Sequence, residues 1–388
     1  MVSPDEIARQ MNGVLTEPAK GRSEAFLPSP VIQNHAAFLA WLPDGSLGCA
    51  WFGGTLEGKS DISIYASRLC PDQGRWLPPS RITDDPARSE QNPVLWSDGG
   101  SLTLFHTSQI SGNQEGSEVK ARSLSIAGEA VVAGASRTLP LAPGTFVRAP
   151  AVRRGDGALL LPLFHCKAEE GTKWNGSHDT AALAISDDDG KNWRIVDVPE
   201  SLGCVHMTIV PLDGDRMVAF FRRRQADFVY RTLSEDGGES WSVPEATDVP
   251  NNNSSISAIR LRDGRIALVC NPISAASSGD RRLSLYDELG EENDRADSNG
   301  GIEPVWGVPR APLTLCFSSD EGVIFPQRRF VEGGTGTCLS NNSIDGRNKE
   351  LSYPMLLEDE DGSLHIAFTF HRRAIKYIRL TSEWLTDQ

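Results

Sequence analysis

The chain has 388 residues, of which 39% are hydrophobic and 23% are charged, as in an ordinary folded protein rather than a disordered one. Its net charge of −14 argues against a nucleic-acid-binding protein and against a protein that lies on an anionic membrane. An anionic ligand would need positive side chains gathered in one pocket.

The N-terminal sequence leaves the localisation open. The stretch MVSPDEIARQMNG has neither a basic n-region nor an apolar core, so no signal peptide is visible. The protein is cytoplasmic if this is its native start, or secreted if this is the start of a mature form. No apolar run reaches the length of a membrane span, and the seven cysteines form no CxxC pattern of the kind that indicates zinc.

Six similar segments follow one another along the chain, each with an Asp-Gly turn between two apolar strands. Asp-Gly is typical of tight β-hairpins, because both residues tolerate positive φ. The turns are 50 to 58 residues apart, except for a last interval of 98 residues. Such a period is typical of a β-propeller, whose blades bury their faces against one another. In chain order the turns contain Asp44, Asp98, Asp156, Asp213, Asp263 and Asp361.

We therefore predict an all-β fold, with residues 1–388 forming one β-propeller of four-stranded antiparallel blades. Six blades are favoured and seven are the alternative, because the long last interval contains either a seventh blade or an insertion at 273–308. This interval includes an expected strand in RRLSLYDEL. The six predicted blades span 28–80, 91–140, 148–197, 206–247, 257–330 and 351–383.

A second motif, S-x-D-x-G-x-x-W, follows several of the hairpins. Its copies are SDDDGKNW (186–193), SEDGGESW (234–241) and SSDEGVIF (318–325), with a degenerate copy in CPDQGRW (70–76). Ser and Asp side chains can satisfy free backbone N–H groups in such a turn, and Gly takes positive φ. The motif resembles the Asp-box of the sialidase superfamily. The resemblance covers roughly 33–380 and implies a sialidase-like propeller, in which Asp-boxes are structural and lie away from the active face.

The resemblance also assigns active-site positions. Sialidases hold a substrate carboxylate with three arginines, use a Tyr–Glu pair as nucleophile and base, and use an Asp as acid/base. In this sequence Tyr353 matches the tyrosine, Arg310 the third arginine and Asp61 the acid/base. The second arginine falls within 222–224, where strand alternation lets only one or two side chains reach the ligand.

Two positions depart from the sialidase pattern. Asn34 or His35 stands where the first arginine would be, which weakens recognition of a sialic acid. His206 stands where the glutamate would be, and it could still serve Tyr353 as a base, because a histidine titrates near neutral pH. A hydrogen-bonded structural role for His206 stays open as the alternative.

The altered set suits β-elimination from a uronate. A base removes the proton at C5, an acid protonates the leaving oxygen at C4, and arginine or asparagine donors neutralise the neighbouring carboxylate. The chain is similar to lyases with sialidase-like propellers that split the terminal rhamnosyl-α-1,4-glucuronate link of plant gums. This similarity rests on the segments QNHAAF, RSEQNPVL, NNNSSIS and FHRRAIKYIRL. The catalytic candidates are then His206, Tyr353 and His35.

Further candidate contacts begin inner strands or lie in basic runs. Arg88 opens blade two, Arg148 opens blade three, Asn252 lies in the polar triple before blade five, and His371 lies in a basic run near the C-terminus. Turn hydrogen bonding or a solvated charged face is the alternative for each. The full set of predicted substrate contacts is Arg310, Arg222, Arg224, Asn34, Arg148, Arg88, Asp61, Asn252 and His371.

Three functions stay open: a β-eliminating lyase, a retaining exo-hydrolase of the sialidase type, and a non-catalytic glycan-binding propeller. The expected partner is an acidic oligosaccharide or polysaccharide, and we expect a monomer. We predict no metal or other cofactor, because no ligand spacing is visible and arginines can neutralise a carboxylate. Calcium stays open, since some uronate lyases use it.

Overall fold

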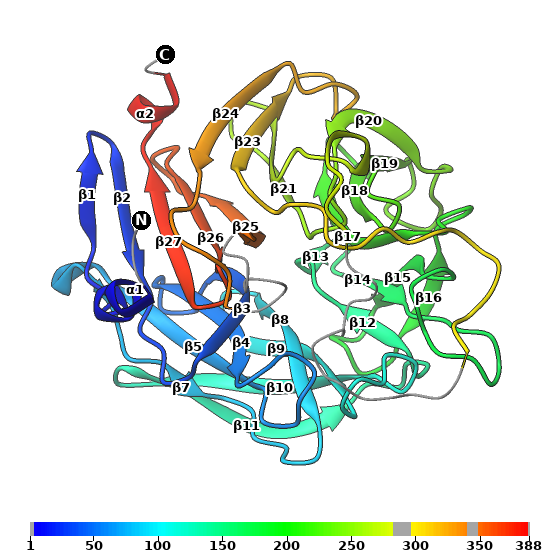
Figure 1. Cartoon of the computed structure of the whole chain (residues 1–388), viewed down its shortest axis with the longest axis horizontal. Helices are drawn as coiled ribbons and strands as arrows, with labels where there is room; N and C mark the ends of the chain where they lie inside the picture. The colour runs from blue at the N-terminus through cyan, green and yellow to red at the C-terminus, as the bar shows by residue number, and fades with distance from the viewer. Residues whose placement is uncertain (1–3, 282–295, 340–347, 387–388) are drawn as a thin grey trace.

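The computed structural model describes residues 4–281, 296–339 and 348–386. In these residues the strands form six antiparallel sheets, arranged in a ring around a central axis (Figure 1). The predicted all-β propeller of six four-stranded antiparallel blades is confirmed, and in three of the sheets a fifth strand is added to the four. The expected strand in RRLSLYDEL falls almost wholly within 282–295, outside the described residues.

The first five blades follow chain order. Blade one contains β3 (Gln33–Trp41), β4 (Leu47–Gly54), β5 (Ser63–Cys70), β6 (Arg75–Trp76) and β7 (Ser80–Arg81). Blade two contains β8 (Ser89–Ser97), β9 (Leu102–Gln109), β10 (Glu118–Ala127) and β11 (Ala130–Thr138). Blade three contains β12 (Thr145–Val147), β13 (Val152–Arg153), β14 (Leu159–His165), β15 (Thr180–Ser186) and β16 (Arg194–Asp197). Blade four contains β17 (Cys204–Pro211), β18 (Met217–Arg223), β19 (Phe228–Ser234) and β20 (Glu245–Pro250). Blade five contains β21 (Ser257–Arg260), β22 (Ile266–Cys270), β23 (Leu313–Ser318) and β24 (Gln327–Glu332).

Blade six joins the two ends of the chain, a pairing that no local sequence pattern predicts. This sheet contains the C-terminal strands β25 (Leu351–Glu358), β26 (Leu364–Phe370) and β27 (Ala374–Leu380) and two strands from the N-terminal end of the chain. β27 pairs with β2 (Arg22–Phe26), and β2 pairs in turn with β1 (Thr16–Ala19); Figure 1 shows β2 beside β27. Pairing of β2 with β27 covers what would otherwise be an open sheet edge. The short helices are α1 (Pro4–Gln10), α2 (Ser382–Thr386), η1 (Pro71–Gln73) and η2 (Ala275–Ser277).

The three Asp-box motifs share one hydrogen-bond geometry. In each, the serine hydroxyl accepts a bond from the glycine N–H four residues later, at 2.8 Å for Ser186 and Ser234 and 2.9 Å for Ser318. The serine donates in turn to the aspartate, whose carboxylate accepts backbone N–H groups further along the turn. The motif therefore stabilises the turn between the third and fourth strands of a blade.

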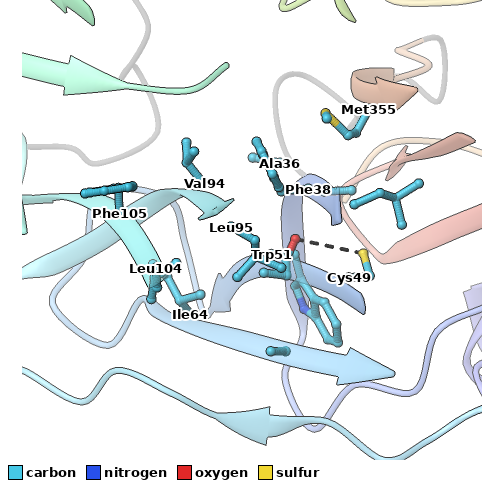
Figure 2. Packing of buried hydrophobic residues seen from close by; sticks show 14 of the residues in the cluster. Ala36, Phe38, Cys49, Trp51, Ile64, Val94, Leu95, Leu104, Phe105 and Met355 are labelled. Atoms are coloured by element: carbon cyan, nitrogen blue, oxygen red, sulfur yellow. Dashed lines mark hydrogen bonds between the residues drawn. The ribbon is translucent and has the colours of Figure 1, made fainter. Parts of the chain in front are cut away.

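Neighbouring blades pack through apolar side chains. Figure 2 shows Phe38 and Trp51 of blade one in the same cluster as Val94 and Phe105 of blade two. Phe38 and Trp51 are almost completely buried, and the cluster continues into blades three and six. This packing holds the inner strands at fixed positions, so that side chains near their first residues converge on the axis.

Four inner strands have a β-bulge near their beginning, seen as a shift of register against the second strand of the blade. In each bulge one residue has a positive φ, and these residues are Ala36, Asn92, His206 and Tyr353. A bulge re-aims the side chains beside it. His206 and Tyr353 thereby leave the regular strand alternation at the mouth of the propeller.

Candidate active site

A cavity that is partly open to solvent lies where the inner strands begin, and it has about 340 Å³ of space between atoms when the open solvent is included. Residues of five blades line it, although they lie far apart in the sequence. Four of the predicted site residues share this cavity: His206, Arg222, Arg224 and Tyr353. The other lining residues are Glu57, Gln91, Asn92, Gln114, Phe146, Phe164 and Trp174.

Tyr353 lies within a group of arginines. Its phenol oxygen accepts a hydrogen bond from Nη1 of Arg222 at 2.8 Å, which leaves the phenol hydrogen available for another acceptor. The guanidinium carbons of Arg148, Arg222 and Arg310 lie 5.4, 5.8 and 5.9 Å from the centroid of the tyrosine ring. Three cations around one side chain favour an anionic ligand beside it.

His206 lies beside Tyr353 in the cavity lining, with the two rings edge to face. The centroid of its ring is 5.5 Å from that of Tyr353 and 4.8 Å from that of Phe164. Its Nδ1 atom is buried without a hydrogen-bond partner in the described part of the chain. Burial, and then the charges of Arg222 and Arg224, lower the pKa of His206 well below 6.5. The imidazole is therefore neutral at pH 7 and able to accept a proton.

The three consecutive arginines 222–224 lie at the end of β18, and their side chains point to alternate sides of the strand, as strand alternation predicts. Arg222 and Arg224 line the cavity, whereas Arg223 donates to the carbonyl of Leu202 at 2.8 Å on the other side of the strand. Arg224 is neutralised by Asp179, whose Oδ2 lies 2.6 and 2.8 Å from its nitrogens. Among the described residues, no carboxylate forms an ion pair with Arg222, and its Nη2 has no partner. Nη2 of Arg222 is thus a donor without a partner among the described residues, whereas the charge of Arg224 is neutralised by Asp179.

A buried carboxylate missed by the sequence analysis, Glu350, organises the other arginines. Nη1 of Arg310 donates to it at 2.9 Å, Nε of Arg372 donates at 3.1 and 3.2 Å, and the hydroxyl of Ser352 donates at 2.6 Å. Burial alone would raise the pKa of Glu350, but the charges of Arg372 and Arg310 outweigh it and hold the pKa well below the usual range. Arg310, a predicted substrate contact, is therefore already paired, and it is not among the lining residues.

Glu57 is the carboxylate that the fold brings into the cavity, rather than the predicted Asp61. Both residues lie between β4 and β5, but Asp61 is exposed and accepts a bond from the N–H of Thr55 at 2.8 Å. Glu57 lines the cavity and forms an ion pair with Arg372. No motif marks either residue of this loop, so the choice between them depended on the loop conformation.

Asn34 and His35 do not line the cavity. Asn34 is fully buried, and its Oδ1 accepts from the indole N–H of Trp51 at 2.8 Å while its amide nitrogen donates to backbone carbonyls. The structure does not support the predicted substrate contact there, because the side chain is used within the fold. His35 lies against Tyr353 with 4.3 Å between ring centroids, and its Nδ1 lies 2.8 Å from the hydroxyl of Thr369. His35 therefore supports the tyrosine from its buried side.

Arg88, Asn252 and His371 also lie outside the cavity lining. Arg88 donates to the hydroxyl and the carbonyl of Ser108, at 2.9 Å each, and blade two contributes Gln91 and Asn92 in its place. Asn252 donates to a backbone carbonyl at 2.8 Å. His371 accepts from a backbone N–H just before β25, and burial lowers its pKa to about 4. These side chains form tertiary hydrogen bonds, which the short motifs around them could not reveal.

One wall of the cavity is aromatic, and it was not predicted from the sequence. Phe146 and Phe164 stack with 5.1 Å between ring centroids, and Trp174 continues the wall. The guanidinium of Arg224 lies 5.5 Å from the ring of Trp174 and 5.2 Å from that of Trp306. The other lining residues are mostly polar, so the cavity combines one aromatic wall with many polar groups. No repeat marks these aromatic residues, so the sequence carried no signal for them.

The family model for the BNR repeat-like domain matches residues 45–366, more than half of the chain. The chain belongs to this family. The resemblance to the sialidase superfamily that its Asp-boxes indicated is confirmed by this match and by the solved structures that share the fold. A search of the curated proteins found no match.

Solved structures share the fold of this BNR repeat-like protein at low sequence identity. A Hadza microbial sialidase, Hz136, has a TM-score of 0.67 and 12% identity over 91% of this chain. The sialidase of Trypanosoma rangeli has a TM-score of 0.60 and 14% identity over 97% of it. The chain spans only 66% and 59% of the lengths of these two proteins. A protein of unknown function from Dyadobacter fermentans is covered over 100% of its length, with a TM-score of 0.63, 16% identity and 94% of this chain covered.

Metal ligands are not visible in the described part of this BNR repeat-like protein. No group of three or more His, Cys, Asp or Glu side chains there could hold a metal ion. No helix in 4–281, 296–339 or 348–386 is long and apolar enough to cross a bilayer. The lining of the cavity includes two arginine side chains, Arg222 and Arg224.

Acidification is expected to destabilise this BNR repeat-like protein below pH 6.5. Burial lowers the pKa of His35, His106 and His206 below 6.5, so the folded chain keeps them neutral while the unfolded chain binds protons. As the pH is lowered, each histidine lowers the free energy of unfolding by up to about 1.4 kcal/mol per pH unit, and Glu350 lowers it further below its unfolded pKa of 4.5. Denaturant unfolding at pH 8, 6 and 5 measures this free energy. His106→Gln should flatten the profile, and a free energy of unfolding that rises from pH 8 to pH 5 would contradict the assignment.

Proposed function

We propose that this propeller is a lyase that cleaves the linkage of a terminal acidic sugar by β-elimination. The first candidate substrate is the L-rhamnose-α-1,4-D-glucuronate unit on side chains of plant gum or arabinogalactan. One observation carries the proposal: a neutral histidine, a tyrosine hydroxyl and an arginine with an unpaired donor, namely His206, Tyr353 and Arg222, lie in one cavity. The sialidase-like fold supports a glycan-processing role more generally.

Each of the three groups has a distinct part in the proposed reaction. Arg222 pairs with the uronate carboxylate through its free Nη2, which makes the hydrogen at C5 more acidic. His206 takes that proton, and the electrons of the C5–H bond form a double bond between C4 and C5. The bond from C4 to O4 breaks, and Tyr353 gives its phenol hydrogen to the leaving oxygen. Arg222 already donates to the phenol oxygen at 2.8 Å and can stabilise the charge left there.

A second candidate function is exo-hydrolysis with retention, and Glu57 is the observation that favours it. A retaining hydrolase needs a nucleophile and an acid/base on opposite sides of the glycosidic bond. Tyr353 and Glu57 both line the cavity, and they could fill these roles. The lyase is preferred because the residue beside Tyr353 is a neutral imidazole rather than a carboxylate.

Product analysis separates the two functions. The purified protein is incubated with rhamnose-capped arabinogalactan and, separately, with an α-linked sialoside. A lyase releases rhamnose and leaves a C4–C5 double bond conjugated with the carboxylate, which absorbs in the far ultraviolet. A hydrolase releases a free sugar acid without that absorbance. Release of sialic acid alone would replace the lyase proposal with the hydrolase, and binding without any product would refute both.

A further inference from the structure

Asp179 connects two residues of the cavity lining without lining the cavity itself. It lies directly before β15 and is fully buried. Its Oδ1 accepts the indole N–H of Trp174 at 2.8 Å, and its Oδ2 accepts hydrogen bonds from Nε and Nη2 of Arg224 at 2.8 and 2.6 Å. Both partners line the cavity. One buried carboxylate therefore fixes an aromatic side chain and a cation of the candidate site.

The backbone and two aromatic rings hold the same unit together. The carbonyl of Asp179 accepts the N–H of Gly203 at 2.7 Å, and the carbonyl of Gly203 accepts the N–H of Arg224 at 2.9 Å. The guanidinium carbon of Arg224 lies 5.5 and 5.2 Å from the ring centroids of Trp174 and Trp306, within the range of a cation–π contact. These contacts keep Arg224 beside the cavity even when the carboxylate is removed.

Pairing with Asp179 decides which cavity arginine can offer an uncompensated charge to a ligand. Arg224 is neutralised, whereas Nη2 of Arg222 has no partner among the described residues. The charge of Arg224 reaches its neighbours. Burial and the charge of Arg224, opposed by Tyr353, lower the pKa of Arg222 to about 10. Burial and then the charges of Arg222 and Arg224 lower the pKa of His206.

We propose that Asp179 is a positioning residue of the site. It fixes Trp174 and neutralises Arg224, so that a sugar carboxylate pairs with Arg222 instead. This inference rests on the proposed function, in which a carboxylate on Arg222 presents the hydrogen at C5 to His206. A carboxylate drawn to Arg224 would move C5 away from the base, and a small displacement of a reacting atom slows a reaction strongly. An uncompensated Arg224 would also weaken His206 as a base, because a nearby positive charge disfavours the protonated imidazole.

Binding of sodium D-glucuronate, measured by isothermal titration calorimetry, separates this role from a merely structural one. Asp179→Asn keeps the shape of the side chain, and its amide oxygen can still accept the indole N–H of Trp174, but the charge is lost. We expect Kd for glucuronate to fall by about tenfold, because Arg224 then offers a second full charge. We expect kcat on rhamnose-capped arabinogalactan to fall by about tenfold as well. Structural damage would weaken binding, so equal or weaker binding by Asp179→Asn would overturn the proposal.

Two further variants serve as controls. Asp179→Asn combined with Arg224→Met removes the released charge, so its affinity for glucuronate should return to the wild-type value. Glu332→Gln removes a partly buried carboxylate that pairs with Lys376 at 2.6 Å outside the cavity lining, and it should leave the affinity and kcat unchanged. If the double variant still binds glucuronate about tenfold more tightly than the wild type, then Arg224 is not the cause and the proposal is wrong.

Failure of this inference can be distinguished from failure of the proposed function. If the wild-type protein forms no unsaturated product, the lyase proposal fails, and the glucuronate affinities still decide the role of Asp179. If the wild type is active and Asp179→Asn matches it in kcat and affinity, only the inference fails. If Asp179→Asn does not fold, a crystal structure of the wild-type protein with glucuronate decides. We expect the carboxylate on Nη2 of Arg222 with the Arg224–Asp179 pair intact; a carboxylate on Arg224, or none in the cavity, would overturn the proposal.

Discussion

Replacing His206 with asparagine is expected to lower turnover of the cleaved glycan by about 10²- to 10⁴-fold, the range for a general base, while the propeller stays folded. The neutral imidazole is the proposed proton acceptor, and the asparagine amide cannot take that proton. Asparagine is chosen because residue 206 has a φ of 54°, in the left-handed region that asparagine tolerates better than most residues. The measurement is the initial rate of double-bond formation at 25 °C.

A matched control separates loss of the base from loss of structure. His165→Asn removes an imidazole that bonds to Thr145 outside the cavity lining, and it should keep the wild-type rate. Added imidazole should restore part of the activity of His206→Asn only. If His206→Asn keeps the wild-type rate, then His206 is not the base and the proposed mechanism is wrong.

Replacing Arg222 with methionine is expected to lower kcat/KM by about 10²- to 10³-fold, the loss that follows removal of a transition-state charge donor. Two effects combine in this variant. The uronate carboxylate loses its free guanidinium donor, and Tyr353 loses the 2.8 Å bond that positions its hydroxyl. Methionine keeps much of the side-chain volume, so the buried position is not left empty.

Arg223→Met is the matched control, because it removes the same charge from the next residue of β18. Arg223 faces away from the cavity and donates to the carbonyl of Leu202, so its loss should lower the melting temperature more than the rate. Steady-state kinetics on both variants, with melting temperatures to check folding, measure the difference. Equal loss of activity in the two variants would mean that net charge rather than the Arg222 contact drives catalysis.

The repeated local patterns of this protein were predictable from its sequence. Asp-Gly turns at a regular spacing predicted the hairpins, and the Asp-box at 234–241 folds through its own Ser and Asp side chains. Such features depend on residues a few positions apart, so a short stretch of sequence contains all their partners. The joining of β2 to β27 was not predicted, because its partners lie at opposite ends of the chain.

The candidate site was predictable where a residue opens an inner strand or lies at the end of the strand that pairs with it. His206 and Tyr353 are of the first kind, Arg222 and Arg224 are of the second, and all four line the cavity. Glu57 and Trp174 lie in loops whose conformation no repeat specifies, and they were missed. Asn34 has a suitable position in the sequence, but the fold engages its amide in internal hydrogen bonds.

The all-β repeat was predictable from the sequence, because turn chemistry and strand periodicity are local, although six blades were only favoured over seven. Which charges are free depends on the three-dimensional arrangement. Arg310 has a carboxylate partner forty positions later, and Arg148 and Arg222 have none among the described residues. Electrostatic pairing depends on distance in space, and in a propeller the residues around the axis come from every part of the chain.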